Sequence, residues 1–148
     1  MGGKTGIFLV VQMEYTVTSM EPHVAQCILS ATAKALATYS GDTINVVPVS
    51  TVSIREGKIW LINYFMDKTL ANILACDKVA LVCWRDMNGY QIKGNAVYLT
   101  SGPVFDEAVS WVRSLLSERV VKGLIIITPQ EVYDVSPFKD TKEKFQVN

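Results

Sequence analysis

The chain has 148 residues, of which 49% are hydrophobic, and its 14 Lys and Arg residues balance 14 Asp and Glu residues. This length supports one globular domain with a substantial core. The balanced charge, without a run of like charges, argues against nucleic acid or an anionic membrane surface as a partner. The mean hydropathy of +0.23 exceeds what a monomer of this size needs, and it predicts an oligomer.

The apolar run at residues 7–11 is too short to cross a bilayer, and the start of the chain is followed by no secretory cleavage pattern. We therefore expect a cytoplasmic protein.

The cysteines are odd in number and far apart, at Cys27, Cys76 and Cys83. We expect small buried side chains rather than a disulfide framework or zinc ligands, and no structural metal.

The N-terminal part predicts an arm or a strand followed by a helix. Residues 1–18 contain the apolar run, which has no period that would separate an arm from a strand. Ser19 is the predicted N-cap of the helix and Pro22 lies in its first turn. Apolar residues recur on this helix at i, i+3, i+4 and i+7, which gives it one apolar face. His23 also lies on this helix, and we expect its side chain to be exposed or satisfied rather than catalytic.

From residue 35 onward, short strands alternate with turns. Gly94 predicts a bend, Asn88-Gly89 a tight hairpin turn, and Pro129 a break between the last two strands. A helix opens at Gly102-Pro103 and ends near Glu118, and residues 139–148 are expected to form a flexible tail. Six or more strands with peripheral helices predict a mainly β domain closed into a small barrel. The predicted strands are 35–39, 45–54, 59–62, 79–84, 90–99, 124–127 and 131–135.

Residues 63–69 interrupt an apolar strand with polar groups just where a helix begins. Asp67 is the predicted N-cap, and Lys68 and Thr69 fall in the first turn. Free backbone N–H groups, a Lys ammonium and a Thr hydroxyl together form a phosphate site without a glycine-rich loop. An ordinary capped helix with a solvated lysine fits the same residues.

The usual catalytic motifs are missing: the sequence contains no G-x-S-x-G, H-E-x-x-H, C-x-x-C, G-x-G-x-x-G or P-loop. The acidic residues fall at turns or helix starts, where solvation or capping is their expected role. Pro48 lies inside a strand-like run and requires a bulge or an unpaired edge, which exposes backbone groups and the Ser50 hydroxyl. A binding site is therefore favoured over acid/base catalysis.

Four segments in this order resemble the FMN-binding split-barrel family related to pyridoxamine 5'-phosphate oxidase, especially its short single-domain members. They are Asn-Val-Val-Pro-Val-Ser at 45–50, Lys-Thr-Leu-Ala-Asn-Ile at 68–73, Lys-Val-Ala-Leu at 78–81 and Gly-Tyr-Gln-Ile-Lys-Gly at 89–94. The likeness extends from about residue 35 to residue 137. It implies a six-stranded antiparallel split barrel, one domain over 1–148, and a homodimer that holds FMN between its subunits.

The resemblance also implies residue roles. Lys68 and Thr69 would bind the phosphate, and Gln91 and Lys93 would lie near the flavin. The backbone beside the flavin edge and the strand end beside the ring would come from Val47, Pro48, Val49, Ser50, Ile62, Asn63 and Tyr64. The chain lacks the extended C-terminal part with which the oxidase grips pyridoxal phosphate, which makes oxidation of vitamin B6 doubtful.

Two functions of different classes follow. One is an FMN-dependent oxidoreductase, such as a flavin reductase with a nicotinamide donor or another redox partner. The other is a non-enzymatic FMN carrier or one-electron transfer protein. A pyridoxamine 5'-phosphate oxidase-like enzyme, or the same barrel holding a deazaflavin or haem, stays an alternative. FMN would supply the redox chemistry while the protein sets its orientation and exposure.

Overall fold

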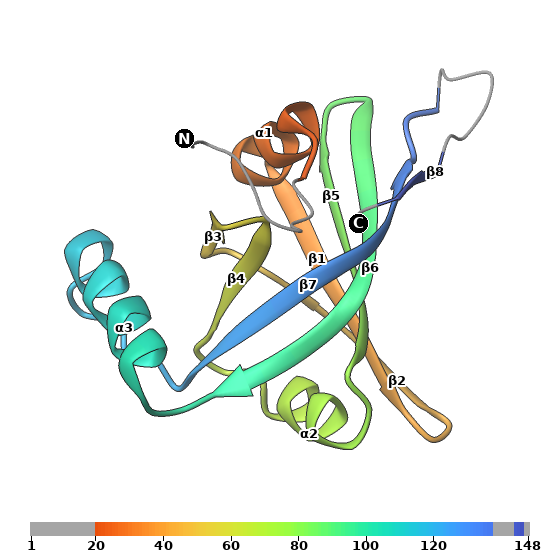
Figure 1. The fold of residues 1–148 in the computed structure, drawn as a ribbon. Coiled ribbons are helices and arrows are strands. Elements are labelled where there is room, and N and C mark those ends of the chain that lie inside the picture. The colour runs from red at the N-terminus through yellow and green to blue at the C-terminus, as the bar shows by residue number, and fades with distance from the viewer. Residues whose placement is uncertain (1–19, 138–143, 147–148) are drawn as a thin grey trace.

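The computed structural model describes residues 20–137 and 144–146, which form a mainly antiparallel β structure with three helices (Figure 1). In this part of the chain no helix is long and apolar enough to cross a membrane. The predicted N-terminal arm lies outside the described residues, as does Ser19. The prediction of Ser19 as a helix N-cap is wrong, because the first helix begins at Pro22 and its N-cap is Glu21. The elements in chain order are α1 (Pro22–Ser30), β1 (Ala33–Ser40), β2 (Thr43–Pro48), β3 (Val52–Arg55), β4 (Lys58–Asn63), α2 (Asp67–Ala75), β5 (Lys78–Arg85), β6 (Asn88–Leu99), α3 (Pro103–Leu115), β7 (Gly123–Asp134) and β8 (Lys144–Gln146).

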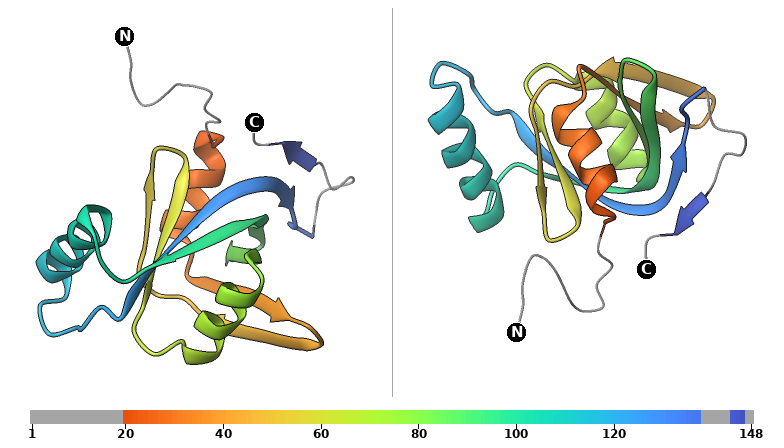
Figure 2. Two further views of the ribbon diagram at one scale, coloured as in Figure 1. Left: turned by 60° about the horizontal axis from the view of Figure 1, so that its bottom comes forward. Right: turned by 90° about the horizontal axis from the view of Figure 1, so that it is seen from above.

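The strands form one antiparallel sheet in the order β2-β1-β5-β6-β7-β4-β3, with β8 paired to β7. The mainly β class is confirmed, but the path has seven strands, where six were expected. The sheet curls around its core, as the two turned views show (Figure 2). Its end strands β2 and β3 are not paired with each other along this path, so the barrel is split rather than closed.

Pro48 explains why the predicted strand over 45–54 is two strands. Proline has no N–H to continue a ladder, and β2 ends at this residue on the edge of the sheet. The chain then turns inward: Val49 is buried and its N–H donates to the Lys34 carbonyl at 3.0 Å. β3 begins only at Val52. The predicted edge position of Pro48 is confirmed.

Unlike Pro48, Pro129 does not end a strand, because β7 continues through it without a break. Pro129 pairs with Gly94, where the register of β6 against β7 shifts. A Cβ at Gly94 would lie 2.2 Å from the Thr128 carbonyl oxygen, so only glycine allows the backbones to approach this closely. The bend predicted at Gly94 is confirmed, and the break predicted at Pro129 is wrong because the irregularity accommodates a residue without an N–H.

Other element ends differ slightly from the predictions. The β5–β6 turn lies at residues 86–87, with Asp86 at φ +55°, while Asn88 already pairs with Arg85. Asp tolerates this left-handed conformation better than most residues, so Asp86 takes the place that was predicted for Asn88-Gly89. Helix α3 ends at Leu115 rather than near Glu118. Within the segment expected to be a flexible tail, Lys144–Gln146 form a strand.

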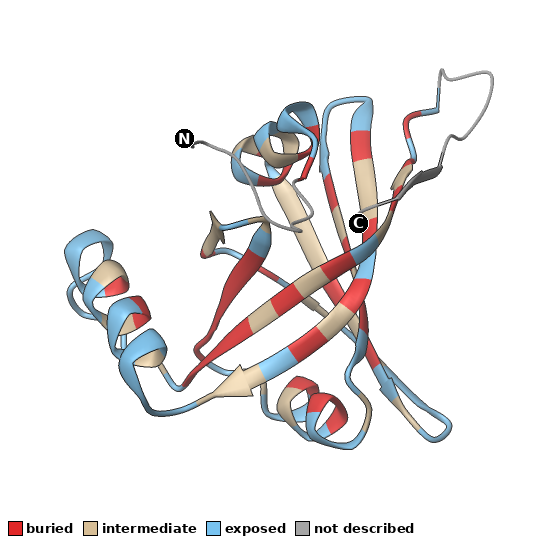
Figure 3. Cartoon of the chain, viewed as in Figure 1, coloured by how far each residue is buried: buried red, intermediate tan, exposed pale blue. Residues whose placement is uncertain are grey.

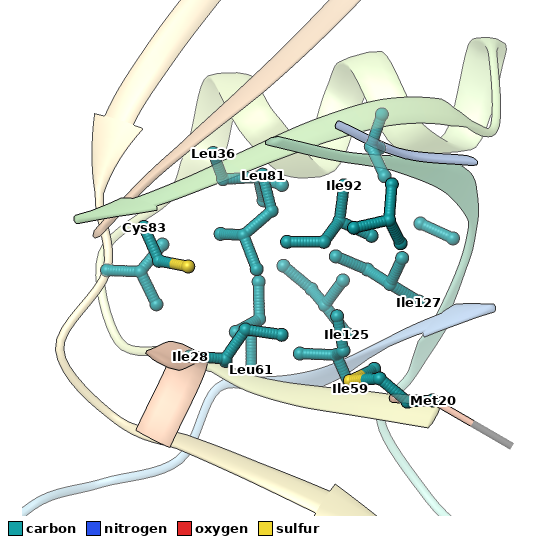
Figure 4. Packing of buried hydrophobic residues seen from close by; sticks show 14 of the residues in the cluster. Met20, Ile28, Leu36, Ile59, Leu61, Leu81, Cys83, Ile92, Ile125 and Ile127 are labelled. Atoms are coloured by element: carbon teal, nitrogen blue, oxygen red, sulfur yellow. The ribbon is translucent and has the colours of Figure 1, made fainter. Parts of the chain in front are cut away.

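The core fills the interior of the curled sheet (Figure 4). Alternating residues of the strands point inward, as the banding of buried positions shows (Figure 3). Helix α1 adds Val24 and Ile28 to this core, and α2 adds Ile73. Helix α3 instead packs on the outer face of β4 and β7, where a second cluster comprises Trp60, Ile62, Tyr64, Ala108, Val112 and Leu124.

Candidate functional site

Asn63 fixes the loop that joins β4 to α2. Its side chain is only 1% exposed. The side-chain oxygen accepts the Met66 N–H at 2.6 Å, and the amide nitrogen donates to the Tyr98 hydroxyl oxygen at 2.6 Å. Its main-chain carbonyl accepts the Lys122 N–H at 2.9 Å. Asn63 therefore ties the loop to β6 through its side chain and to the segment that precedes β7 through its main-chain carbonyl.

The Tyr98 hydroxyl is a half-buried partner of this amide. Burial raises the pKa of Tyr98, the Asn63 hydrogen bond acts in the opposite direction, and the Asp67 carboxylate raises it further. The hydroxyl is therefore neutral at physiological pH and provides a stable acceptor for the Asn63 amide.

Helix α2 begins directly after this loop. Its N-cap is Met66, whose side chain makes no capping hydrogen bond, and Asp67 is the first helical residue. The prediction of Asp67 as N-cap is therefore wrong, because Asn63 orders the preceding loop through the Met66 N–H instead. The N–H groups of the first helical turn have no intrahelical acceptor. This end of α2 can accept an anion.

The two phosphate-site candidates differ in their surroundings. Lys68 is exposed and forms no ion pair with another described residue. Thr69 is fully buried, and its hydroxyl accepts a hydrogen bond from the Asn45 amide at 3.0 Å. Lys68 can thus reach a ligand with its side chain, whereas Thr69 can offer its backbone N–H and link α2 to β2.

Residues 47–50 lie against the end of β4. Thr51, the next residue, accepts the Ile62 N–H with its carbonyl at 3.3 Å and shares a hydrogen bond with the Tyr64 hydroxyl at 3.0 Å. Val49 is buried and Ser50 is exposed. Segment 47–50 therefore lies between two contacts: Thr51 after it bonds to residues 62 and 64, and Asn45 before it bonds to Thr69.

Gln91 and Lys93 lie elsewhere in the chain. They are on β6, opposite Val82 and Ala80 of β5. Lys93 lines a surface pocket of about 580 Å³ on the outer face of the sheet, to which residues 47–50 and 62–69 contribute nothing. Its Nζ lies 5.4 Å from the centroid of the Tyr133 ring. One chain alone therefore does not bring Gln91 and Lys93 to the start of α2.

Two cations that the sequence did not predict adjoin the loop. Lys122 Nζ lies 3.7 Å from Asp67 Oδ1 and 5.8 Å from the Phe65 ring centroid. The Arg119 guanidinium lies 5.0 Å from the ring centroid of Tyr64. No local signal marks these residues, because they reach the loop through the pairing of β4 with β7.

We call the start of α2 and its neighbours the α2 site, which comprises residues 47–50, 62–64 and 67–69 together with Lys122. This site fits a phosphate-bearing ligand. An uncapped helix start and the ammonium groups of Lys68 and Lys122 suit a dianion, since charge-assisted hydrogen bonds to phosphate are among the strongest in proteins. Lys122 lies beside the Asp67 carboxylate and offsets the negative charge of that carboxylate. The neighbouring segment 47–50 offers backbone groups and apolar side chains to a flat ring.

Comparison with known proteins identifies the family of this chain. The sequence profile described as pyridoxamine 5'-phosphate oxidase matches residues 20–139. The chain therefore belongs to the pyridoxamine 5'-phosphate oxidase family, and the resemblance noted from the sequence is confirmed. An uncharacterised protein of Methanocaldococcus jannaschii is 32% identical over 111 residues, which are 71% of this chain and 74% of that protein.

Solved structures share the fold at low sequence identity. HupZ of Group A Streptococcus superposes with a TM-score of 0.71 at 17% identity, covering 80% of this chain and 95% of the other. An FMN-binding protein of Syntrophomonas wolfei gives 0.69 at 16% identity, with 78% and 86% covered. A NimC/NimA family protein of Clostridium acetobutylicum gives 0.66 at 22% identity, with 84% and 93% covered.

Replacement of Asn63 tests whether it holds the loop. Asn63→Ala leaves the Met66 N–H and the Tyr98 hydroxyl without their partner, so we expect a loss of about 2–3 kcal/mol in the free energy of unfolding. Tyr98→Phe should cost about 1 kcal/mol, because it removes only one of these hydrogen bonds. Urea denaturation measures both. Asn88→Ala, at an exposed strand end, is the matched control, and equal stability of the Asn63 and Asn88 variants would contradict the anchoring role.

Proposed function

We propose that this protein binds FMN at the α2 site and acts as an oxidoreductase through it, in the cytoplasm. The observation that carries the proposal is the uncapped start of α2, where the exposed Lys68 is free of ion pairs with the described residues. Membership of the pyridoxamine 5'-phosphate oxidase family supports it, as does the shared fold of the FMN-binding protein of Syntrophomonas wolfei.

Each part of the site has a distinct task in this proposal. Lys68 and the N–H groups of residues 67–69 bind the phosphate, while Lys122 offsets the charge of Asp67. Residues 47–50 hold the edge of the ring through backbone groups, and residues 62–64 form the strand end beside it. FMN would supply hydride or electron transfer, which requires no base from the protein. The titratable groups gathered here are cations, tyrosines and a paired carboxylate, a set better suited to anchoring than to proton abstraction.

A homodimer completes the proposed site. Gln91 and Lys93 lie away from the α2 site in one protomer, so they can adjoin the same flavin only from a partner subunit. The outer face of the sheet carries apolar side chains that suit burial between two copies: Ile44 is 79% exposed and Val46 is 61% exposed. Both belong to the edge strand β2, and a pocket lies beside Ile44. Pairing of two copies would cover this face.

Lys68→Ala tests the phosphate contact. Loss of a charge-assisted hydrogen bond of roughly 1.5–3 kcal/mol should weaken FMN binding at least about tenfold. Isothermal titration of the flavin-free protein measures the dissociation constant. Lys58→Ala removes the same charge from the exposed first residue of β4 and should leave the affinity unchanged. Unaltered FMN binding by the Lys68 variant would refute the assignment.

Sedimentation velocity tests the dimer. We expect the parent protein to sediment as a dimer at micromolar concentration, and Ile44→Glu to dissociate it because a buried carboxylate is costly at an apolar interface. Leu115→Glu places the same charge on another exposed apolar residue, at the end of α3, and should remain dimeric. A parent protein that is monomeric while FMN is bound would overturn the shared site.

Anaerobic addition of NADH or NADPH to the yellow holoprotein tests the oxidoreductase. We expect the flavin absorbance to bleach and to return with ferricyanide or free flavin as acceptor. Pyridoxamine 5'-phosphate with oxygen should give no robust turnover, and its oxidation would indicate the oxidase activity instead. Failure of every donor would favour a carrier or one-electron transfer protein.

A further inference from the structure

Cys27 and Cys83 lie close together although 55 residues separate them along the chain. Cys27 is on α1 and Cys83 on β5, and their Sγ atoms are 3.6 Å apart. Both are free thiols. A disulfide requires a sulfur separation of about 2.0 Å, so the two sulfur atoms must move closer together on oxidation. The sequence predicted buried, unrelated cysteines, whereas the structure pairs two of the three.

The two thiols differ in exposure. Cys83 is fully buried among the side chains of the barrel core (Figure 4). Burial and the neighbouring Cys27 thiol raise the pKa of Cys83 to about 12, so this sulfur stays protonated. Cys27 is only partly buried, and it is therefore the sulfur that a reagent in solvent reaches first.

We propose that Cys27 and Cys83 are a redox-active dithiol, which a hydroperoxide converts to a disulfide that joins α1 to β5. The Cys27 thiolate attacks one peroxide oxygen and breaks the O–O bond, which gives a sulfenic acid and, with hydrogen peroxide, releases hydroxide. The Cys83 sulfur then displaces the hydroxyl group of the sulfenic acid, which takes the Cys83 proton and leaves as water. The proton that Cys27 lost on forming its thiolate neutralises the hydroxide of the first step. In total two thiols and one hydrogen peroxide give one disulfide and two waters.

A structural metal is not favoured at this position. In the described part of the chain no three His, Cys, Asp or Glu side chains are grouped so that they could hold a metal ion. The Cys83 thiol also lies 3.8 Å from the Tyr90 carbonyl oxygen, a weak contact that a protonated sulfur can make. The pair is therefore arranged as a dithiol.

The disulfide would fasten α1 to the sheet. Val24 and Ile28 of α1 are buried in the core, and Cys83 lies opposite Lys34 of β1 in the sheet. Crosslinking two residues this far apart in sequence restricts the unfolded chain strongly, so oxidation should stabilise the fold. This inference does not depend on the proposed flavin.

Mass spectrometry after oxidation tests the pair. The full chain is treated with hydrogen peroxide, denatured, alkylated with N-ethylmaleimide and digested. We expect one crosslinked product that contains Cys27 and Cys83 and has lost two hydrogen atoms, with Cys76 alkylated. Cys76→Ser should form the same crosslink, and Cys27→Ser should form none. Alkylation of all three thiols, or oxidation of Cys27 to a sulfinic acid while Cys83 stays a thiol, would overturn the proposal.

Thermal unfolding gives a second readout that does not depend on variants of the buried Cys83. Oxidised protein should melt about 5 °C or more above the reduced protein, and dithiothreitol should abolish the difference. Cys27→Ser, at the partly buried position, should have the same melting temperature under both conditions. An equal melting temperature of the oxidised and reduced parent protein would also contradict a crosslink between α1 and β5.

Discussion

The three hydrogen bonds of Asn63 are the constraint on which the α2 site depends. They connect the end of β4 to the start of α2, to Tyr98 of β6 and to Lys122 before β7. Because Asn63 is buried, breaking any of these bonds leaves a polar group of this residue without water to replace its partner. The position of Lys68 relative to segment 47–50 therefore follows from a buried amide rather than from a glycine-rich loop.

A second constraint separates the two edge strands. Pro48 ends β2, and the chain then buries Val49, which bonds to Lys34, and Thr51, which bonds to Ile62 and Tyr64. The same break that splits the barrel thus places the backbone beside the start of α2. Fold and candidate site have a common origin here, since the residue that cannot extend the ladder also exposes the segment proposed to hold a flavin.

Local chemistry explains what the sequence could predict. The edge position of Pro48 and the bend at Gly94 depend on the residues that occupy them, and these predictions agree with the structure. Pairing between residues far apart along the chain explains what the sequence could not predict. The continuity of β7 through Pro129 depends on Gly94 opposite it, and Lys122 reaches Asp67 only because β4 pairs with β7. The contact of Cys27 with Cys83 likewise requires α1 to pack on β5.

The central claim is that a phosphate group gives the α2 site its affinity for a flavin. Riboflavin has the same ring as FMN and lacks the phosphate, so comparing the two compounds isolates the contribution of the phosphate to the binding affinity. Isothermal titration of the flavin-free protein with each compound measures it most directly. FMN should bind at least about tenfold more tightly than riboflavin, and equal affinity for the two, or no binding of FMN, would contradict the claim.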